Sequence, residues 1–97
     1  MISNQILQNT IDGVKGITKI DLSVVDADGN VLAETAGDSE DYCATVKIFA
    51  DSPADSQAIL GYQFFKVYDE SQLEYIVVAK GEAEDVYMIG KIVEIGR

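Results

Sequence analysis

The spacing of apolar residues in the first part of the chain indicates an α-helix. Three of them recur at the i, i+4, i+7 positions that share one helix face: Leu7, Ile11 and Val14. Ser3 is a suitable N-cap, and Gly16 is suited to end the helix in the left-handed conformation. We therefore predict an amphipathic helix over residues 2–15.

The period then falls to two, which is typical of a half-buried strand. Apolar and polar residues alternate over residues 20–24, and Asp28-Gly29 separates this run from a second apolar run over residues 31–33. Asp-Gly between two such runs predicts a hairpin with a two-residue turn, in which both turn residues take positive φ. That register sets Val25 opposite Leu32, and Val24 opposite Ala33.

The same turn carries the pattern D-x-D-x-N at Asp26, Asp28 and Asn30, which is similar to the first half of a calcium loop. An EF-hand loop also needs glycine at its sixth position and glutamate at its twelfth. Those positions hold Val31 and Gly37. The turn chemistry alone explains the acidic residues, so we expect a solvated turn and no metal site.

A helical region follows. Tyr42, Val46 and Phe49 fall at i, i+4, i+7, with Asp38 and Ser39 as candidate N-caps. Ser52-Pro53 interrupts this pattern, and proline is tolerated at the first position of a new helix. We predict a second helical piece over residues 53–60, ended by Gly61.

Residues 62–68 and 73–80 are rich in aromatic and β-branched residues and are separated by a connector of hairpin length, so they predict a second hairpin. Residues 82–95 fit either a helix or a strand, and we favour a helix. The expected order is helix, hairpin, helical region, hairpin, helix. This order predicts a single α+β domain over residues 1–97, with an antiparallel sheet of two hairpins flanked by helices.

Adjacent apolar pairs in the expected strands place hydrophobic side chains on both sheet faces: Val24-Val25, Phe64-Phe65 and Val77-Val78. A sheet with one solvated face would alternate cleanly. Either helices cover both faces or a second subunit covers one of them. We therefore expect a homodimer.

The amino-acid composition argues against several classes of function. Seven basic and seventeen acidic residues give a formal charge of −10, which argues against nucleic acids and anionic membranes as partners. The chain has no histidine and one cysteine, Cys43, so it lacks a Cys/His nucleophile and the usual zinc ligands. Its carboxylate clusters lie at expected helix starts, where they complement the helix dipole. We expect a cytoplasmic protein that is not an enzyme and holds no cofactor.

The ordered set of motifs resembles the N-terminal sensor domain of bacterial transcriptional regulators of the sugar-diacid-recognition and purine-catabolism types. The matching features are the first hairpin with Asp26, Gly29 and Ala33, then Gly61 and the strand after it, and finally Gly81 with Glu84-Asp85. The resemblance covers nearly the whole chain. It implies a PAS-like or profilin-like sensor that normally precedes a helix-turn-helix.

Two departures from the family bear on function. Family members continue into a longer chain, whereas this sequence stops at Arg97, so we expect an excised domain or a truncated relative without a DNA-reading element. The connection after the first hairpin lacks the histidine of sugar-diacid sensors and is acidic, which argues against a dianionic ligand.

Two functions remain open. The first is a small-molecule-sensing and dimerising regulatory domain of a transcriptional regulator, with an unknown metabolite held between the sheet and the helical connection. The candidate ligand-binding residues are Tyr42 and Ser56 as hydrogen-bonding groups and Lys66 as the nearest cation. The second is a roadblock-type dimerisation or protein-docking module without a small ligand.

Overall fold

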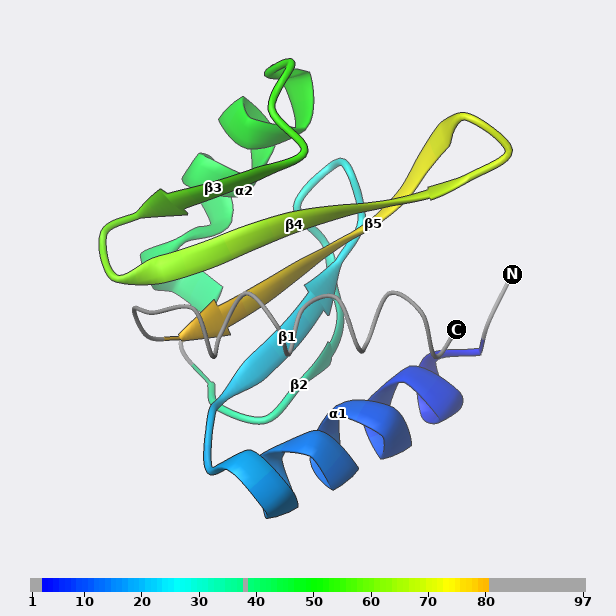
Figure 1. The fold of residues 1–97 in the computed structure, drawn as a ribbon, viewed down its shortest axis with the longest axis vertical. Coiled ribbons are helices and arrows are strands. Elements are labelled where there is room, and N and C mark those ends of the chain that lie inside the picture. Colours follow the sequence, from blue (N-terminus) through cyan, green and yellow to red (C-terminus); the bar gives the residue numbers. More distant parts are fainter. Residues whose placement is uncertain (1–2, 38, 81–97) are drawn as a thin grey trace.

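The computed structural model describes residues 3–37 and 39–80. Within these ranges, five strands form one antiparallel sheet in the order β2-β1-β5-β4-β3 (Figure 1). The strands are β1 (Leu22–Val25), β2 (Val31–Glu34), β3 (Ser56–Ile59), β4 (Tyr62–Asp69) and β5 (Gln72–Lys80). The described helices are α1 (Asn4–Thr18), the 3₁₀ turn η1 (Ser39–Asp41) and α2 (Cys43–Asp51). The α+β class and the antiparallel sheet agree with the prediction.

Helix α1 has the predicted N-cap, Ser3, and ends later than predicted. The Ser3 hydroxyl accepts a hydrogen bond from the Ile6 amide at 3.2 Å, as an N-cap does. The predicted end at Gly16 is wrong, since Lys19 takes the left-handed conformation instead, with φ of 64°. The last turn is held by a hydrogen bond of 2.8 Å from the Thr18 hydroxyl to the Val14 carbonyl oxygen. A second hydrogen bond runs from the Lys19 amide to the Lys15 carbonyl oxygen.

The β1–β2 hairpin is present, but its turn is longer than predicted. Val24 pairs with Ala33 as expected, whereas Val25 pairs with Val31 across an irregularity and not with Leu32. The turn differs because the Asp26 carboxylate organises the connecting residues. It accepts hydrogen bonds of 2.9 Å from the backbone amides two and four positions later, and of the predicted turn pair only Gly29 has positive φ.

The helical region divides into η1 and α2, with Tyr42 at the N-cap position of α2. Tyr42, Val46 and Phe49 are all buried, so the predicted apolar face is confirmed. The 3.6-residue period therefore identified the correct packing surface of this short helix.

The predicted helix over residues 53–60 is wrong, because this stretch contains β3. Ser56 to Ile59 pairs with β4, and Leu60 and Gly61 form the turn between the strands with φ of 53° and 83°. Positive φ at both central residues is the mark of the two-residue hairpin turn whose twist matches its strands. Hydrogen bonding to β4 therefore overrides the capping signal of Ser52-Pro53.

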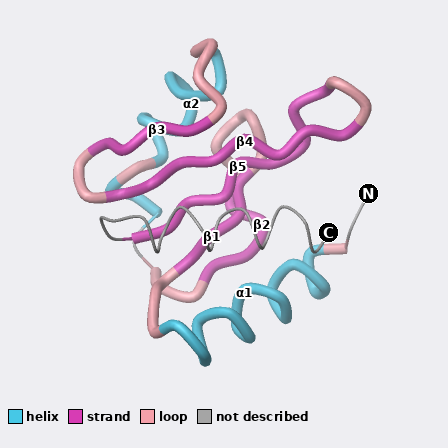
Figure 2. Tube along the Cα trace, in the orientation of Figure 1, coloured by secondary structure: helices cyan, strands magenta, loops and turns pink. Residues whose placement is uncertain are grey.

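Strands β4 and β5 agree with the second predicted hairpin. Asp69 pairs with Gln72, and the two turn residues between them, Glu70 and Ser71, have positive φ. Figure 2 shows this hairpin continuing as a two-stranded ribbon past the other strands. β5 also pairs with β1, which joins the first hairpin to the rest of the sheet.

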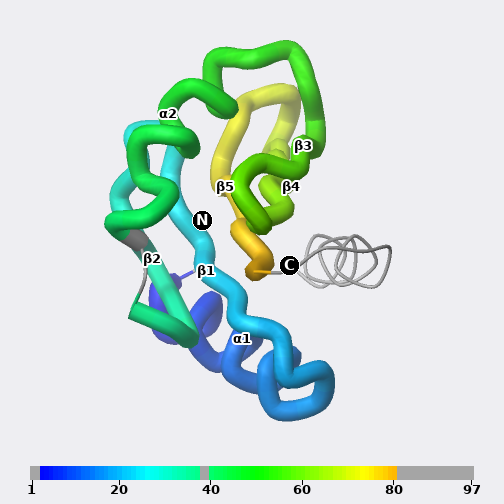
Figure 3. The backbone as a smooth tube through the Cα atoms, turned by 90° about the vertical axis from the view of Figure 1, so that its left-hand side faces the viewer, coloured from blue at the N-terminus to red at the C-terminus, as the bar shows by residue number. Residues whose placement is uncertain are grey.

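Both sheet faces are apolar, as the paired hydrophobic residues predict. Successive residues enter different clusters: Val24 and Phe65 belong to one, Val25 and Phe64 to the other. α1 contacts β1 and β2 and contributes Leu7 to the first cluster, whereas α2 contacts β4 and β5 and contributes to the second (Figure 3). The two described α-helices therefore pack on opposite faces of the sheet, α1 against the β1–β2 part of one face and α2 against β4 and β5 on the other.

Neither described α-helix combines the length and hydropathy that a bilayer-spanning helix needs. The prediction made for residues 82–95 lies outside the described residues.

Candidate functional site

A small pocket lies where β1 and β4 begin and β5 ends. Its volume is about 10 Å³. Its lining combines charged, hydroxyl and apolar side chains, contributed by Asp21, Leu22, Ser23, Ala36, Tyr42, Tyr62, Val78 and Lys80. A space of this volume holds about one water molecule.

Tyr42 and Ser23 form the buried polar contact of this pocket. The two hydroxyl oxygens lie 2.5 Å apart, and both residues are almost fully buried. The Tyr42 ring is fixed by edge-on contact with the Tyr62 ring, whose centroid is 5.1 Å away. Since α2 and β1 each supply one partner, this hydrogen bond ties the helix to the central part of the sheet.

Tyr42→Phe is expected to lower the free energy of unfolding by about 1–3 kcal/mol, because it leaves the Ser23 hydroxyl buried without its partner. Urea denaturation followed by circular dichroism measures the loss. The matched control is the double variant Tyr42→Phe/Ser23→Ala, which removes both hydroxyls and should regain part of that loss. Unchanged stability of Tyr42→Phe would show that the hydrogen bond contributes nothing.

The structure does not bring the three predicted ligand-binding residues together. Tyr42 lines the pocket, whereas neither Ser56 nor Lys66 does. Lys66 is buried, and its ammonium group donates a hydrogen bond to the backbone oxygen of Ser52 and lies 5.0 Å from the centroid of the Phe49 ring. A cation at the carboxyl end of α2 complements the helix dipole, so the contacts of Lys66 are those of a helix cap.

The predicted residues are separated because the connection after α2 is a strand. Ser56 begins β3 at the sheet edge and is exposed to solvent. Ser56 therefore lies away from the pocket that Tyr42 lines.

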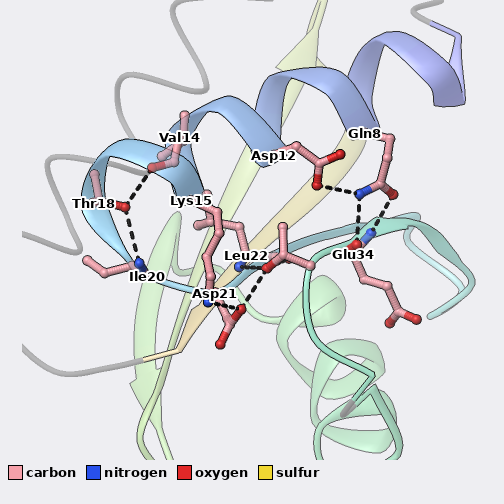
Figure 4. A network of polar contacts seen from close by, with 10 residues as sticks. Gln8, Asp12, Val14, Lys15, Thr18, Ile20, Asp21, Leu22 and Glu34 are labelled. Carbon is pink, nitrogen blue, oxygen red and sulfur yellow. Dashed lines mark hydrogen bonds and ion pairs between the residues drawn. The ribbon is translucent and has the colours of Figure 1, made fainter.

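An ion pair lies beside the pocket. The Lys15 ammonium group contacts the Asp21 carboxylate at 2.6 Å (Figure 4). The Thr35 hydroxyl donates to the same oxygen at 3.0 Å. The hydrogen bond from Lys15 is the main cause that holds the pKa of Asp21 below its usual value, against partial desolvation. This pair connects the end of α1 to the start of β1.

Within the described ranges, no group of three or more cysteine or acidic side chains is arranged to hold a metal ion. In the loop with the calcium-like pattern, the Asp26 carboxylate accepts hydrogen bonds from Asp28 and Asn30. Desolvation raises the pKa of Asp26, and these hydrogen bonds outweigh it, so the net shift is downward. The contacts of Asp26 are those of a turn-forming side chain.

The two edges of the sheet differ. At the β2 edge, the side-chain amide of Gln8 makes two hydrogen bonds with the backbone of Glu34 (Figure 4). At the β3 edge, Ser56, Gln57 and Ala58 are exposed, and no charged residue lies within the strand. Edge strands usually carry charge, proline or a covering element, because unpaired backbone groups otherwise recruit another strand.

The sequence did not lead us to predict a strand edge at residues 56–59. The prediction of a helix over residues 53–60 concealed it, although Leu60-Gly61 before an aromatic strand was a usable turn signal.

Comparisons of this chain with protein-family models, with curated proteins and with solved structures found no match.

Proposed function

We propose that this chain is a dimerisation and protein-docking module of the roadblock type, in which two copies join through their β3 edges. The observation that supports the proposal most directly is the uncharged, solvent-exposed β3 strand at one end of the sheet. The pocket supports ligand binding less well, because it is small and only one of the three candidate residues lines it.

The register of β3 shows which backbone groups are available. Ile59 pairs with Tyr62 across the two-residue turn, and the Lys66 amide donates to the Asp55 carbonyl oxygen at 2.9 Å. The backbone groups of Asp55 and Ile59 therefore point toward β4. Since these directions alternate along a strand, Ser56 and Ala58 direct their N–H and C=O groups outward. Two residues per chain can thus extend the sheet.

A second copy fits this edge in an antiparallel arrangement. With Gln57 opposite Gln57 of the second copy, Ser56 of each chain lies opposite Ala58 of the other. Both pairs can then exchange two backbone hydrogen bonds. The interface is isologous, as in most homodimers. The paired strands would form one sheet through both subunits.

Charge also permits this arrangement. In a chain with a formal charge of −10, an interface without acidic residues is needed for close approach of two copies. The nearest acid is Asp55, and the antiparallel register separates the two copies of Asp55 by four residues, or about 13 Å along the strands. This exceeds the Debye length of about 8 Å at physiological ionic strength, so their repulsion is screened.

Analytical ultracentrifugation over a range of concentrations tests the proposal. We expect a dimer that dissociates on dilution without unfolding, because each subunit keeps its own two helix-covered clusters. A monomer at high micromolar concentration would overturn the proposal.

A small-molecule sensor is the second candidate, and the chemistry of the pocket lining is the observation in its favour. Its two tyrosines, Ser23 and Lys80 present both aromatic and polar groups to one small space. A thermal-shift screen of small metabolites tests this candidate. Ser23 lines the pocket, so a ligand that stabilises the parent chain but not Ser23→Ala would support sensing. A screen that finds no stabilising metabolite would leave the docking module as the remaining candidate.

A further inference from the structure

A sheet with two open edges would not stop at a dimer. If both β2 and β3 accepted a strand from another copy, each added subunit would present a fresh edge, and the assembly would grow without closing. A dimer through β3 therefore requires that β2 be closed. The structure contains a side chain in the position to close it.

The backbone of Glu34 points away from the sheet. The neighbouring amide, that of Thr35, donates to the Leu22 carbonyl oxygen of β1 at 2.9 Å, so the groups of Glu34 face the opposite direction. This outward direction is the one from which another strand would add. Glu34 therefore carries the backbone groups that a strand added at this end of β2 would bind.

Gln8 of α1 binds both of these groups. Its side-chain nitrogen donates to the Glu34 carbonyl oxygen at 2.8 Å, and its side-chain oxygen accepts from the Glu34 amide at 3.1 Å. A carboxamide offers one donor and one acceptor side by side, as the backbone of an antiparallel neighbour does. Gln8 thus reproduces the pair of hydrogen bonds that an added strand would make.

The orientation of this amide is itself fixed. The Gln8 nitrogen also donates to the Asp12 carboxylate at 2.9 Å, one helical turn further along α1 (Figure 4). A carboxylate accepts hydrogen bonds only, so it selects the nitrogen side of the amide. The oxygen is thereby directed at the Glu34 amide.

We propose that Gln8 is a side-chain cap that closes the β2 edge to a second copy of this chain and so limits assembly to a closed dimer. The limit to a dimer rests on the proposed function, whereas the closure of β2 does not. The occupant kept out is the β2 strand of another copy, which would pair antiparallel with this one.

Gln8→Ala tests the proposal. Alanine is the best helix former, so the gain in helix propensity offsets the loss of the Gln8–Asp12 hydrogen bond within α1. We expect sedimentation velocity to show species at about twice the mass of the parent assembly or more, because β2 now pairs in addition to β3. Hydrogen exchange of the Glu34 amide should accelerate when the variant is diluted until it no longer associates.

Gln5→Ala is the matched control. Gln5 lies on the same helix, and its side-chain nitrogen donates a hydrogen bond to the Asn9 side-chain oxygen at 2.9 Å, within α1 and away from β2. Its loss should leave both the mass and the Glu34 exchange rate unchanged.

A second background separates this proposal from the proposed function. In a chain whose β3 edge is blocked by Ala58→Pro, adding Gln8→Ala should produce a dimer through β2 from a monomer. If the parent chain is monomeric, the proposed dimer through β3 is wrong, but the effect of Gln8→Ala on the β2 edge can still be measured. If Gln8→Ala raises the mass in neither background, Gln8 does not close the edge and the inference is overturned.

Discussion

Replacing Ala58 with proline is expected to leave the protein monomeric at concentrations where the parent chain is dimeric. The Ala58 amide points away from β4, so proline removes no hydrogen bond within the subunit. In the proposed dimer it removes two of four interchain bonds, each worth about 0.5–1.5 kcal/mol, and places a ring carbon in the interface. We expect the dimer to weaken by about 10- to 100-fold or more, measured by sedimentation equilibrium.

Ala58→Ser is the control for this change, since it alters the same side chain but keeps the amide. It should dimerise like the parent. Thermal unfolding of both variants at low concentration should match that of the parent, which would show that the subunit is intact. A proline variant that dimerises normally would place the interface away from β3.

The largest loss of stability is expected from Phe64→Ala. Phe64 is fully buried in the cluster beneath α2, with ring centroids 5.7 Å from Phe49 and 6.4 Å from Tyr42. Truncating a buried phenylalanine usually costs about 3–5 kcal/mol, from lost transfer energy and the cavity left behind. Domains of this size are stable by about 5–15 kcal/mol, so urea denaturation should show the loss of about a fifth or more of the total free energy of unfolding.

Phe64→Leu serves as the comparison, because it keeps most of the buried volume and should cost markedly less. A second comparison is Ile48→Ala, on the exposed side of α2, where the change should be small because Ile48 is 72% exposed. Equal losses for Phe64→Ala and Ile48→Ala would contradict the packing of α2 on this face.

The spacing of apolar residues correctly predicted the helices that bury one face against the sheet. α1 was found from Leu7 and Ile11, and the buried side of α2 from Val46 and Phe49, because burial of one helix face requires the 3.6-residue spacing. The apolar pairs in the strands likewise predicted a sheet with two covered faces. These features depend on local sequence alone.

Features that depend on distant partners were missed. Ser56 to Ile59 has no strong strand signal of its own, and its conformation comes from pairing with β4. The capping of β2 by Gln8 joins residues 26 positions apart, and nothing in the sequence around Gln8 indicates it. The placement of Ser56 away from the Tyr42 pocket has the same origin, because it depends on the pairing of β3 with β4.

The end of α1 and the first turn show a milder form of this problem. The sequence offered Gly16 and Asp28-Gly29 as the natural left-handed positions, yet Lys19 ends the helix and Asp26 shapes the turn. At Gly16, the hydrogen bond that Thr18 donates outweighs the conformational preference of glycine. Gly29 keeps its positive φ, and the backbone amides that donate to the Asp26 carboxylate set the length of the turn. Helix and turn boundaries are therefore less predictable than helix faces.

The central place of β5 has a consequence for synthesis on the ribosome. β5 lies between β1 and β4 but is made after both, so the first hairpin cannot join the rest of the sheet until Lys80 has emerged. Before then, the nascent chain exposes apolar strand faces with no partner to cover them. Its surplus of negative charge helps to keep neighbouring unfinished chains apart during that interval.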